Sequence, residues 1–159
     1  MKIAVISSYA YIVSNVNYGA LLQYYALQEY LKERGHHPYW IRYVLRLSLT
    51  QRLNQTLNSV VFCRAEYKKK IQLRSFLDFA DRYLALSDKI YVGEAAINSD
   101  PPAADYYITG SDQVWAGTLP ANFLTFVGDD TRKIAYAVSF GRDELPALLC
   151  PDTGHIPKS

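Results

Sequence analysis

Several features that would identify a function at once are missing from this 159-residue sequence. No two of its glycines stand in a GxG pair and no GxxxxGK[ST] pattern occurs, so the dinucleotide and P-loop fingerprints are both absent. Its two cysteines, Cys63 and Cys150, lie far apart without a CxxC pair or a histidine cluster, and they imply neither a zinc site nor a disulfide framework. A nucleotide-dependent oxidoreductase is accordingly not favoured.

The sequence also lacks strong charge and long apolar runs. Its net charge is +2 at pH 7, and no nucleic-acid motif accompanies the short run Lys68-Lys69-Lys70, so we predict no nucleic-acid partner. No apolar run approaches the roughly 18 residues that a membrane span needs. The apolar start gives way at Ser7-Ser8 to a tyrosine-rich polar segment, and we expect a soluble, cytoplasmic protein.

What is present is the pattern of an α/β domain. Half of the residues are apolar, and the length suits one domain with a real core. The β-branched run Lys2–Ser7 is typical of the central strand of a parallel sheet, and Tyr39–Tyr43 predicts the second strand. Between them, helical periodicity predicts a helix over Tyr18–Arg34 that ends at Gly35. Gln28 falls among the polar residues in the second half of this helix.

The same patterns predict further elements along the chain. They are a surface helix over residues 73–84, a short strand over 89–92 followed by a helix or turn to 100, a helix-to-turn connection over 122–127, and another buried strand over 132–141. Residues 44–63 fit either a helix or an insertion packed against the domain.

The stretch Asp105–Trp115 is the most informative in the chain. Tyr106–Thr109 is aromatic or β-branched and predicts a strand buried on both faces. Gly110 then allows backbone torsions or a close approach that a Cβ would obstruct, and a hydroxyl, a carboxylate, a carboxamide and an indole follow it. Because ligands of open α/β sheets sit outside the carboxyl ends of the strands, we expect a site in this loop.

Two other predicted strands end in small or polar residues. Ser7-Ser8 and Asn17 follow the first strand, and the strand over residues 132–141 ends in Ser139–Gly141. Asn17 also suits the N-cap of the first helix, where its side-chain oxygen accepts an orphan backbone N–H.

Three motifs in this order resemble the N-terminal half of the polysaccharide pyruvyl transferase family. They are NYGALLQ with ALQEYL within residues 17–31, GSDQVW over 110–115 and KIAYAVSFG over 133–141. The resemblance covers roughly residues 1 to 145. It implies an α/β fold with a Rossmann-like three-layer parallel sheet, forming the N-terminal half of a GT-B-like arrangement in which two such domains face each other across a cleft.

The resemblance also implies a reaction. Members of the family transfer pyruvate from phosphoenolpyruvate to a sugar as a ketal, in surface polysaccharide biosynthesis. By analogy with the GT-B arrangement, this half would hold the acceptor sugar or polysaccharide precursor, and a C-terminal half that this chain is expected to lack would hold the donor. No cofactor, metal or catalytic residue is assigned. The candidates for acceptor binding are Asn17, Tyr18, Gly19, Gly110, Ser111, Asp112, Gln113, Trp115 and Ser139.

Several candidates also have a structural explanation. Asp112 suits the cap of a turn, Trp115 suits the core and Asn17 suits a helix cap. The glycines of these motifs are explained by backbone geometry whatever the function. The family usually has asparagine after the tryptophan, where this chain has Ala116.

Residues 1–144 are predicted to form the domain, and residues 145–159 an irregular tail that fits a frameshifted or truncated product. Two hypotheses stay open. The chain is either the acceptor-side half of a pyruvyl transferase, or a catalytically inactive truncated fragment or stand-alone sugar-binding module. Without a partner domain, the apolar surface for that domain would favour self-association.

Overall fold

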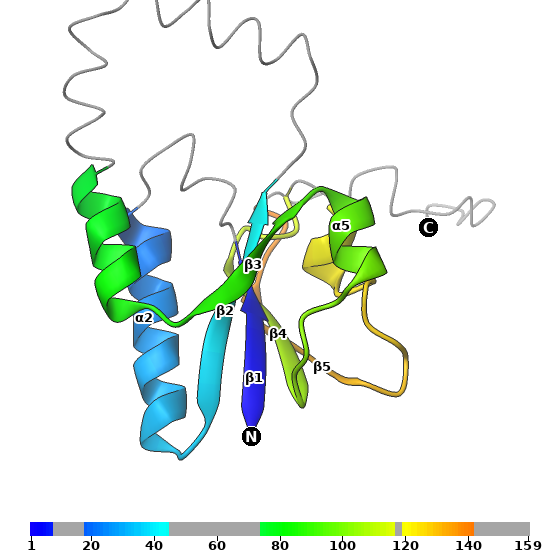
Figure 1. Ribbon diagram of the computed structural model, residues 1–159, viewed down its shortest axis with the longest axis horizontal. Coiled ribbons are helices and arrows are strands. Elements are labelled where there is room, and N and C mark those ends of the chain that lie inside the picture. Colours follow the sequence, from blue (N-terminus) through cyan, green and yellow to red (C-terminus); the bar gives the residue numbers. More distant parts are fainter. Residues whose placement is uncertain (8–17, 45–73, 117–118, 142–159) are drawn as a thin grey trace, which may run out of the picture.

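The computed structural model describes residues 1–7, 18–44, 74–116 and 119–141. These residues form a five-stranded sheet in the order β3-β2-β1-β4-β5, and every neighbouring pair is parallel (Figure 1). The strands are β1 (Lys2–Ile6), β2 (His37–Val44), β3 (Leu86–Val92), β4 (Tyr106–Asp112) and β5 (Arg132–Val138). The predicted α/β class with a parallel sheet is confirmed.

Helical elements cover both faces of the sheet. Helix α2 (Tyr18–Glu33) and a helix over residues 74–83 pack on one face, and the short helix α5 (Glu94–Ser99) and the 3-10 turn η1 (Pro120–Phe123) lie on the other (Figure 1). Each face has its own apolar cluster, one around Trp40 and Phe76 and the other around Ile41 and Ile97. The molecule is therefore built in three layers.

The central position of β1 follows from its sequence. Side chains of a strand alternate between the two faces of the sheet. Ile3 and Val5 belong to the apolar cluster under α2, whereas Ala4 and Ile6 belong to the cluster under α5, and all four are buried. Such a strand has no polar face, which is typical of a parallel sheet covered on both sides.

The boundaries of the outer strands differ from the predictions. β2 begins at His37, two residues before its predicted start at Tyr39. β3 begins at Leu86, three residues before its predicted start at Lys89. The amide of His37 donates to the carbonyl of Met1 (2.8 Å), which draws the start of β2 into the sheet. The segment over residues 44–63 falls outside the described residues except for Val44, the last residue of β2.

The prediction that residues 132–141 form a buried strand is wrong in one respect. β5 is a strand, but it lies at the edge of the described sheet and residues 132–137 are all exposed. Ile134 and Tyr136 are 42% and 50% exposed. Apolar composition alone does not distinguish a central strand from an edge strand, because burial depends on which other segments are neighbours.

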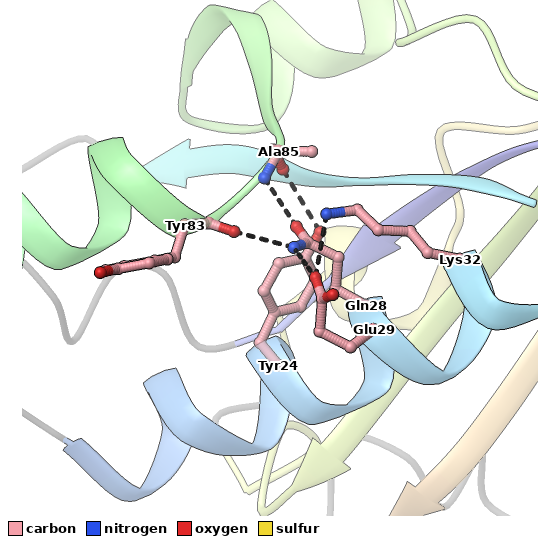
Figure 2. Close-up of polar contacts among 6 residues, drawn as sticks. All are labelled: Tyr24, Gln28, Glu29, Lys32, Tyr83 and Ala85. Carbon is pink, nitrogen blue, oxygen red and sulfur yellow. Dashed lines mark hydrogen bonds and ion pairs between the residues drawn. The ribbon is translucent and has the colours of Figure 1, made fainter.

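Gln28 also differs from its prediction, because it is fully buried rather than on the polar side of α2. Its side-chain nitrogen donates to the carbonyl of Tyr83 (2.9 Å), and its side-chain oxygen accepts from the amide of Ala85 (2.6 Å). Figure 2 shows Gln28 reaching from α2 to the segment that enters β3. A glutamine is buried here because backbone groups satisfy its amide.

Candidate functional site

The strand order reverses between β1 and β4, because the chain builds outward from β1 in one direction to β3 and then continues on its other side with β4. In open parallel sheets the crevice for a ligand lies outside the carboxyl ends of the strands at such a reversal. The loop after β4 starts at this point, and so does the segment after β1. Asn17 belongs to that segment, over residues 8–17, and lies outside the described residues.

The position of Gly110, near the end of β4, accommodates only a residue without a side chain. Its φ is +128°, and a Cβ added to it would lie 1.9 Å from the carbonyl oxygen of Tyr136 and 3.1 Å from Cγ1 of Val138. The close approach predicted for this glycine is confirmed. Its partner is the backbone of β5, so β4 and β5 come into close contact where both strands end.

The loop after β4 and the end of β5 are joined directly. The amide of Trp115 donates to the carbonyl of Ser139 (3.3 Å), and the rings of Trp115 and Phe140 lie 5.3 Å apart. The side chain of Gln113 lies so close to Gly141 that a Cβ there would be 2.5 Å from its Cδ. The structure thus brings together two of the three strand ends that the sequence identified.

Trp115 is held by contacts on its ring and on its indole nitrogen. Its ring stacks on Phe123 with centroids 5.2 Å apart and an interplanar angle of 14°. The indole N–H donates to the carbonyl of Asn122 (3.1 Å). One face of the indole is therefore covered by Phe123, and the residue fixes the conformation of its own loop.

Two residues that the sequence analysis did not single out, Thr109 and Asn122, complete the arrangement. Asn122 is buried, and its side-chain nitrogen donates to the carbonyl of Val114 (2.7 Å). Its own carbonyl accepts from the hydroxyl of Thr109 (2.7 Å) as well as from Trp115. The local signal for Asn122 is a polar residue at the start of the apolar run 122–127, but its partners cannot be inferred from that run.

The exposed candidates differ in position. Gln113 and Ser139 are exposed at the ends of β4 and β5, where the side chain of Gln113 lies against Gly141 and the carbonyl of Ser139 accepts from Trp115. Tyr18 and Gly19 are exposed at the start of α2, and the ring of Tyr18 meets Phe76 edge-on at 5.6 Å. Since α2 follows β1, its first residues lie at the same edge of the sheet as the β4 loop.

Ser111 and Asp112 are the last two residues of β4, and their side chains lie outside the described part of the structure. Within the described ranges, no group of three histidine, cysteine, aspartate or glutamate side chains is arranged to hold a metal ion. None of the helices in those ranges is long and apolar enough to cross a membrane.

A hollow of about 650 Å³ lies at the opposite edge of the sheet, where the strands begin. Its lining includes Tyr39, Lys89 and Asp100. The hydroxyl of Tyr39 donates to the carbonyl of Ala103 (3.0 Å), and burial raises the pKa of Tyr39. A hydrogen bond from Lys89 to Asp100 raises the pKa of that lysine. Tyr39 is thus paired with Ala103, and Lys89 with Asp100. The hollow is separated from the β4 loop by the length of the strands.

An open parallel sheet with this strand order and an ordered loop at its reversal defines a Rossmann-like α/β protein. The profile of the polysaccharide pyruvyl transferase family matches residues 17–156, most of the sequence, and the chain belongs to that family. The match extends past residue 145, beyond the three motifs that carry the resemblance. No curated protein and no solved structure matches the chain.

Proposed function

We propose that this chain supplies the acceptor side of a polysaccharide pyruvyl transferase, which transfers pyruvate from phosphoenolpyruvate to a pair of sugar hydroxyls. The observation that carries the proposal is the loop of residues 113–116, hydrogen-bonded to the end of β5 beside the strand-order reversal. Membership of the family supports this reaction class, and the position of the loop at the strand-order reversal supports an acceptor site there.

The reaction defines what the acceptor site must do. The methylene carbon of phosphoenolpyruvate gains a proton and becomes a methyl group, and one sugar hydroxyl oxygen bonds to the carbon that carried the phosphate. The second hydroxyl oxygen bonds to the same carbon as phosphate leaves. Of the two hydroxyl protons, one balances the new methyl group and the other leaves with the phosphate. The acceptor side therefore has to hold two hydroxyls in a fixed geometry near a proton acceptor.

The exposed polar groups at this edge suit hydroxyl recognition. The carboxamide of Gln113 both donates and accepts hydrogen bonds, and the hydroxyl of Ser139 does the same. The ring of Tyr18, 47% exposed, offers an apolar surface for the C–H face of a sugar. Asn17, Ser111 and Asp112 stay candidates from their motifs.

Trp115 has a different role in this proposal. One face of its ring lies on Phe123, and its N–H donates to the carbonyl of Asn122. In this proposal Trp115 fixes the loop that carries Gln113, rather than serving as the stacking surface for the sugar. Gly110 allows the β5 backbone to approach closely.

We assign the phosphoenolpyruvate site to a second Rossmann-like domain facing this one, as in the GT-B arrangement. The donor carries a phosphate and a carboxylate, and its binding calls for cationic groups aimed at both. Without such a domain, the same edge would act as a sugar-binding module that does not turn over. The localisation that fits either role is the cytoplasm, where activated sugar precursors are assembled.

Binding of candidate acceptor saccharides to the purified chain tests the location of the site. We expect Gln113→Ala to weaken saturable binding about tenfold, because a lost hydrogen bond in a binding site is worth roughly 1.4 kcal/mol. Lys89→Ala, in the hollow at the opposite edge, is the matched control and should leave binding unchanged. The reverse outcome would move the acceptor site to the hollow.

Phosphate release from phosphoenolpyruvate in the presence of the same saccharides tests the reaction. Release above a blank without protein would show that this chain turns over alone and would exclude the inactive fragment. Saturable binding without release is the result expected of the acceptor half.

A further inference from the structure

Glu94, the first residue of α5, contacts two other segments at the carboxyl edge of the sheet. One of its oxygens, Oε1, accepts from the hydroxyl of Tyr43 (2.8 Å) and from the amide of Ala121 (3.1 Å). Tyr43 lies near the end of β2, and Ala121 lies in η1. A single oxygen of Glu94 thus connects the start of α5 with the end of β2 and with η1, which are far apart in the sequence.

The second oxygen of Glu94, Oε2, is buried and has no hydrogen-bond partner among the described residues. A buried acceptor without a donor costs free energy. The start of α5 also does not need this side chain as a cap, since the helix begins after Gly93 without a side-chain capping bond. The stability of α5 alone therefore does not explain why a carboxylate stands here.

The contact of Glu94 with Ala121 leads directly to the candidate site. Ala121 is fully buried and immediately precedes Asn122, whose side chain and carbonyl hold Val114, Thr109 and Trp115. Figure 1 shows α5 beside the segment of η1, on the face of the sheet opposite α2. If η1 shifted along the sheet, Asn122 would shift with it, and the loop after β4 would lose the bonds that order it.

The anchor of this arrangement is the hydroxyl of Tyr43. Its side chain is buried in the apolar cluster under α5, and burial together with the bond to Glu94 raises its pKa. The phenol therefore keeps its proton and stays a donor to Oε1.

We propose that Glu94 is a positioning residue for the candidate site: it fixes η1 through the amide of Ala121, and η1 fixes the β4 loop through Asn122. Its meaning for catalysis rests on the proposed function, but its effect on the loop does not. Among the described side chains, Glu94 forms hydrogen bonds with Tyr43 and Ala121, neither of which is a candidate for acceptor binding, so its effect on the loop runs through Ala121 and Asn122.

The test compares Glu94→Ala with Glu94→Gln by two-dimensional NMR of the full chain. The sequence has two tryptophans, so their indole N–H signals separate the site from the core. In Glu94→Ala we expect the Trp115 signal to shift, because its bond to Asn122 weakens, while the Trp40 signal stays in place. The amide of Ala121 should lose protection from hydrogen exchange by roughly tenfold, the factor for a bond worth about 1.4 kcal/mol.

Glu94→Gln is the rescue variant, since its amide oxygen still accepts from Tyr43 and Ala121. It should restore the Trp115 signal and the protection of Ala121. Ser99→Ala, at the other end of α5, controls for general effects on that helix and should change neither. An unchanged Trp115 signal and unchanged protection in Glu94→Ala would overturn the proposal.

Tyr43→Phe keeps the proposal testable if Glu94→Ala does not fold. It removes only the hydroxyl that anchors Oε1, and we expect the same shifts in smaller size. A folded Tyr43→Phe with a wild-type Trp115 signal and wild-type protection at Ala121 would also overturn it. Acceptor binding is measured separately, so a loop that responds to Glu94 in a chain without sugar affinity would refute the proposed function and leave this inference standing.

Discussion

The central strand β1 and the edge strand β5 are both rich in apolar residues, but their surroundings are opposite. β1 pairs with β2 and β4, and its residues from Ile3 to Ile6 are buried under helices on both faces. β5 pairs with β4, and its residues from Arg132 to Ala137 are exposed. The difference shows that the same apolar pattern produces a core strand or a surface strand according to its place in the strand order.

The two strands also differ in what ties them to the sheet. β1 is held by apolar packing on two sides, which is spread over many contacts. β5 is held by its backbone ladder with β4 and by the close approach at Gly110. Substitutions should therefore affect β1 through lost packing and β5 through backbone geometry.

Gly110→Ala should have the largest effect on the edge strand. The new Cβ would collide with the carbonyl of Tyr136, and φ of +128° is unfavourable for alanine. We expect the free energy of unfolding to fall by about 4 kcal/mol, combining backbone strain with overpacking. Urea denaturation measures this loss. A cost below that of Gly35→Ala would contradict the close approach.

Gly35→Ala is the matched control for that experiment. Its φ is +77°, but nothing lies within 4 Å of an added Cβ, so the substitution carries strain without a collision. We expect it to cost about 1–2 kcal/mol, the penalty of a left-handed conformation. The difference between the two variants isolates the contact between β4 and β5.

The pair Ile6→Ala and Ile134→Ala compares the two strands with the same side chain. Ile6 is fully buried, and its truncation should cost about 3 kcal/mol. Ile134 is 42% exposed, and its truncation should cost less than about 1 kcal/mol. Chemical denaturation of both variants gives the two values. Equal costs would show that β5 is covered in solution, and sedimentation would then reveal whether a second copy covers it.

Gln28→Leu tests the contact between helix α2, which packs on one face of β1, and the segment that enters β3. The substitution keeps most of the side-chain volume but leaves the amide of Ala85 and the carbonyl of Tyr83 without their partner. We expect a loss of about 2 kcal/mol, the cost of leaving buried backbone groups unsatisfied. Gln23→Leu, exposed on the same helix, should stay within about 0.5 kcal/mol of wild type. Similar values for both would mean that Gln28 is not held as its distances indicate.

The smallest effect on the free energy of unfolding at neutral pH is expected for Tyr24→Phe, in the helix α2 that covers one face of β1. Burial raises the pKa of Tyr24 well above its ordinary value near 10. The folded state thus favours the neutral phenol, and its contribution to stability is present below about pH 10 and is lost as the pH rises toward the higher folded pKa. Thermal unfolding between pH 9 and 11 should show a shallower decline in Tm for Tyr24→Phe than for wild type. Parallel declines would contradict the raised pKa.

The sequence predicted those parts of the fold that depend on local residue patterns. The helix from Tyr18 was predicted because its apolar residues repeat with the helical period, and the strands β1 and β4 because their residues form unbroken β-branched or aromatic runs. The exposure of β5 and the burial of Gln28 were not predicted. Both depend on neighbours distant in the sequence, such as Tyr83, which lies 55 positions from Gln28.

The candidate site divides in the same way. The close approach at Gly110 was predicted correctly, because a glycine at the end of a buried strand indicates a position without room for a side chain. The contacts that hold Trp115 were not, since they come from Asn122, Phe123 and Phe140 in later segments. Motifs indicated which strand ends are candidates for a site, and tertiary packing decides which of their side chains are exposed.

The parallel pairing of β1 has a consequence for the synthesis of this protein. β1 emerges first and can pair with β2 early, but its other neighbour is far downstream, as the bond between Lys2 and Asp105 spans 103 positions. At a translation rate of about 5–20 residues per second, one edge of β1 waits roughly 5–20 s for β4. The strand at the centre of the described sheet is thus the first of its five strands to leave the ribosome, and its unpaired edge of backbone N–H and C=O groups is the one that needs protection during that interval.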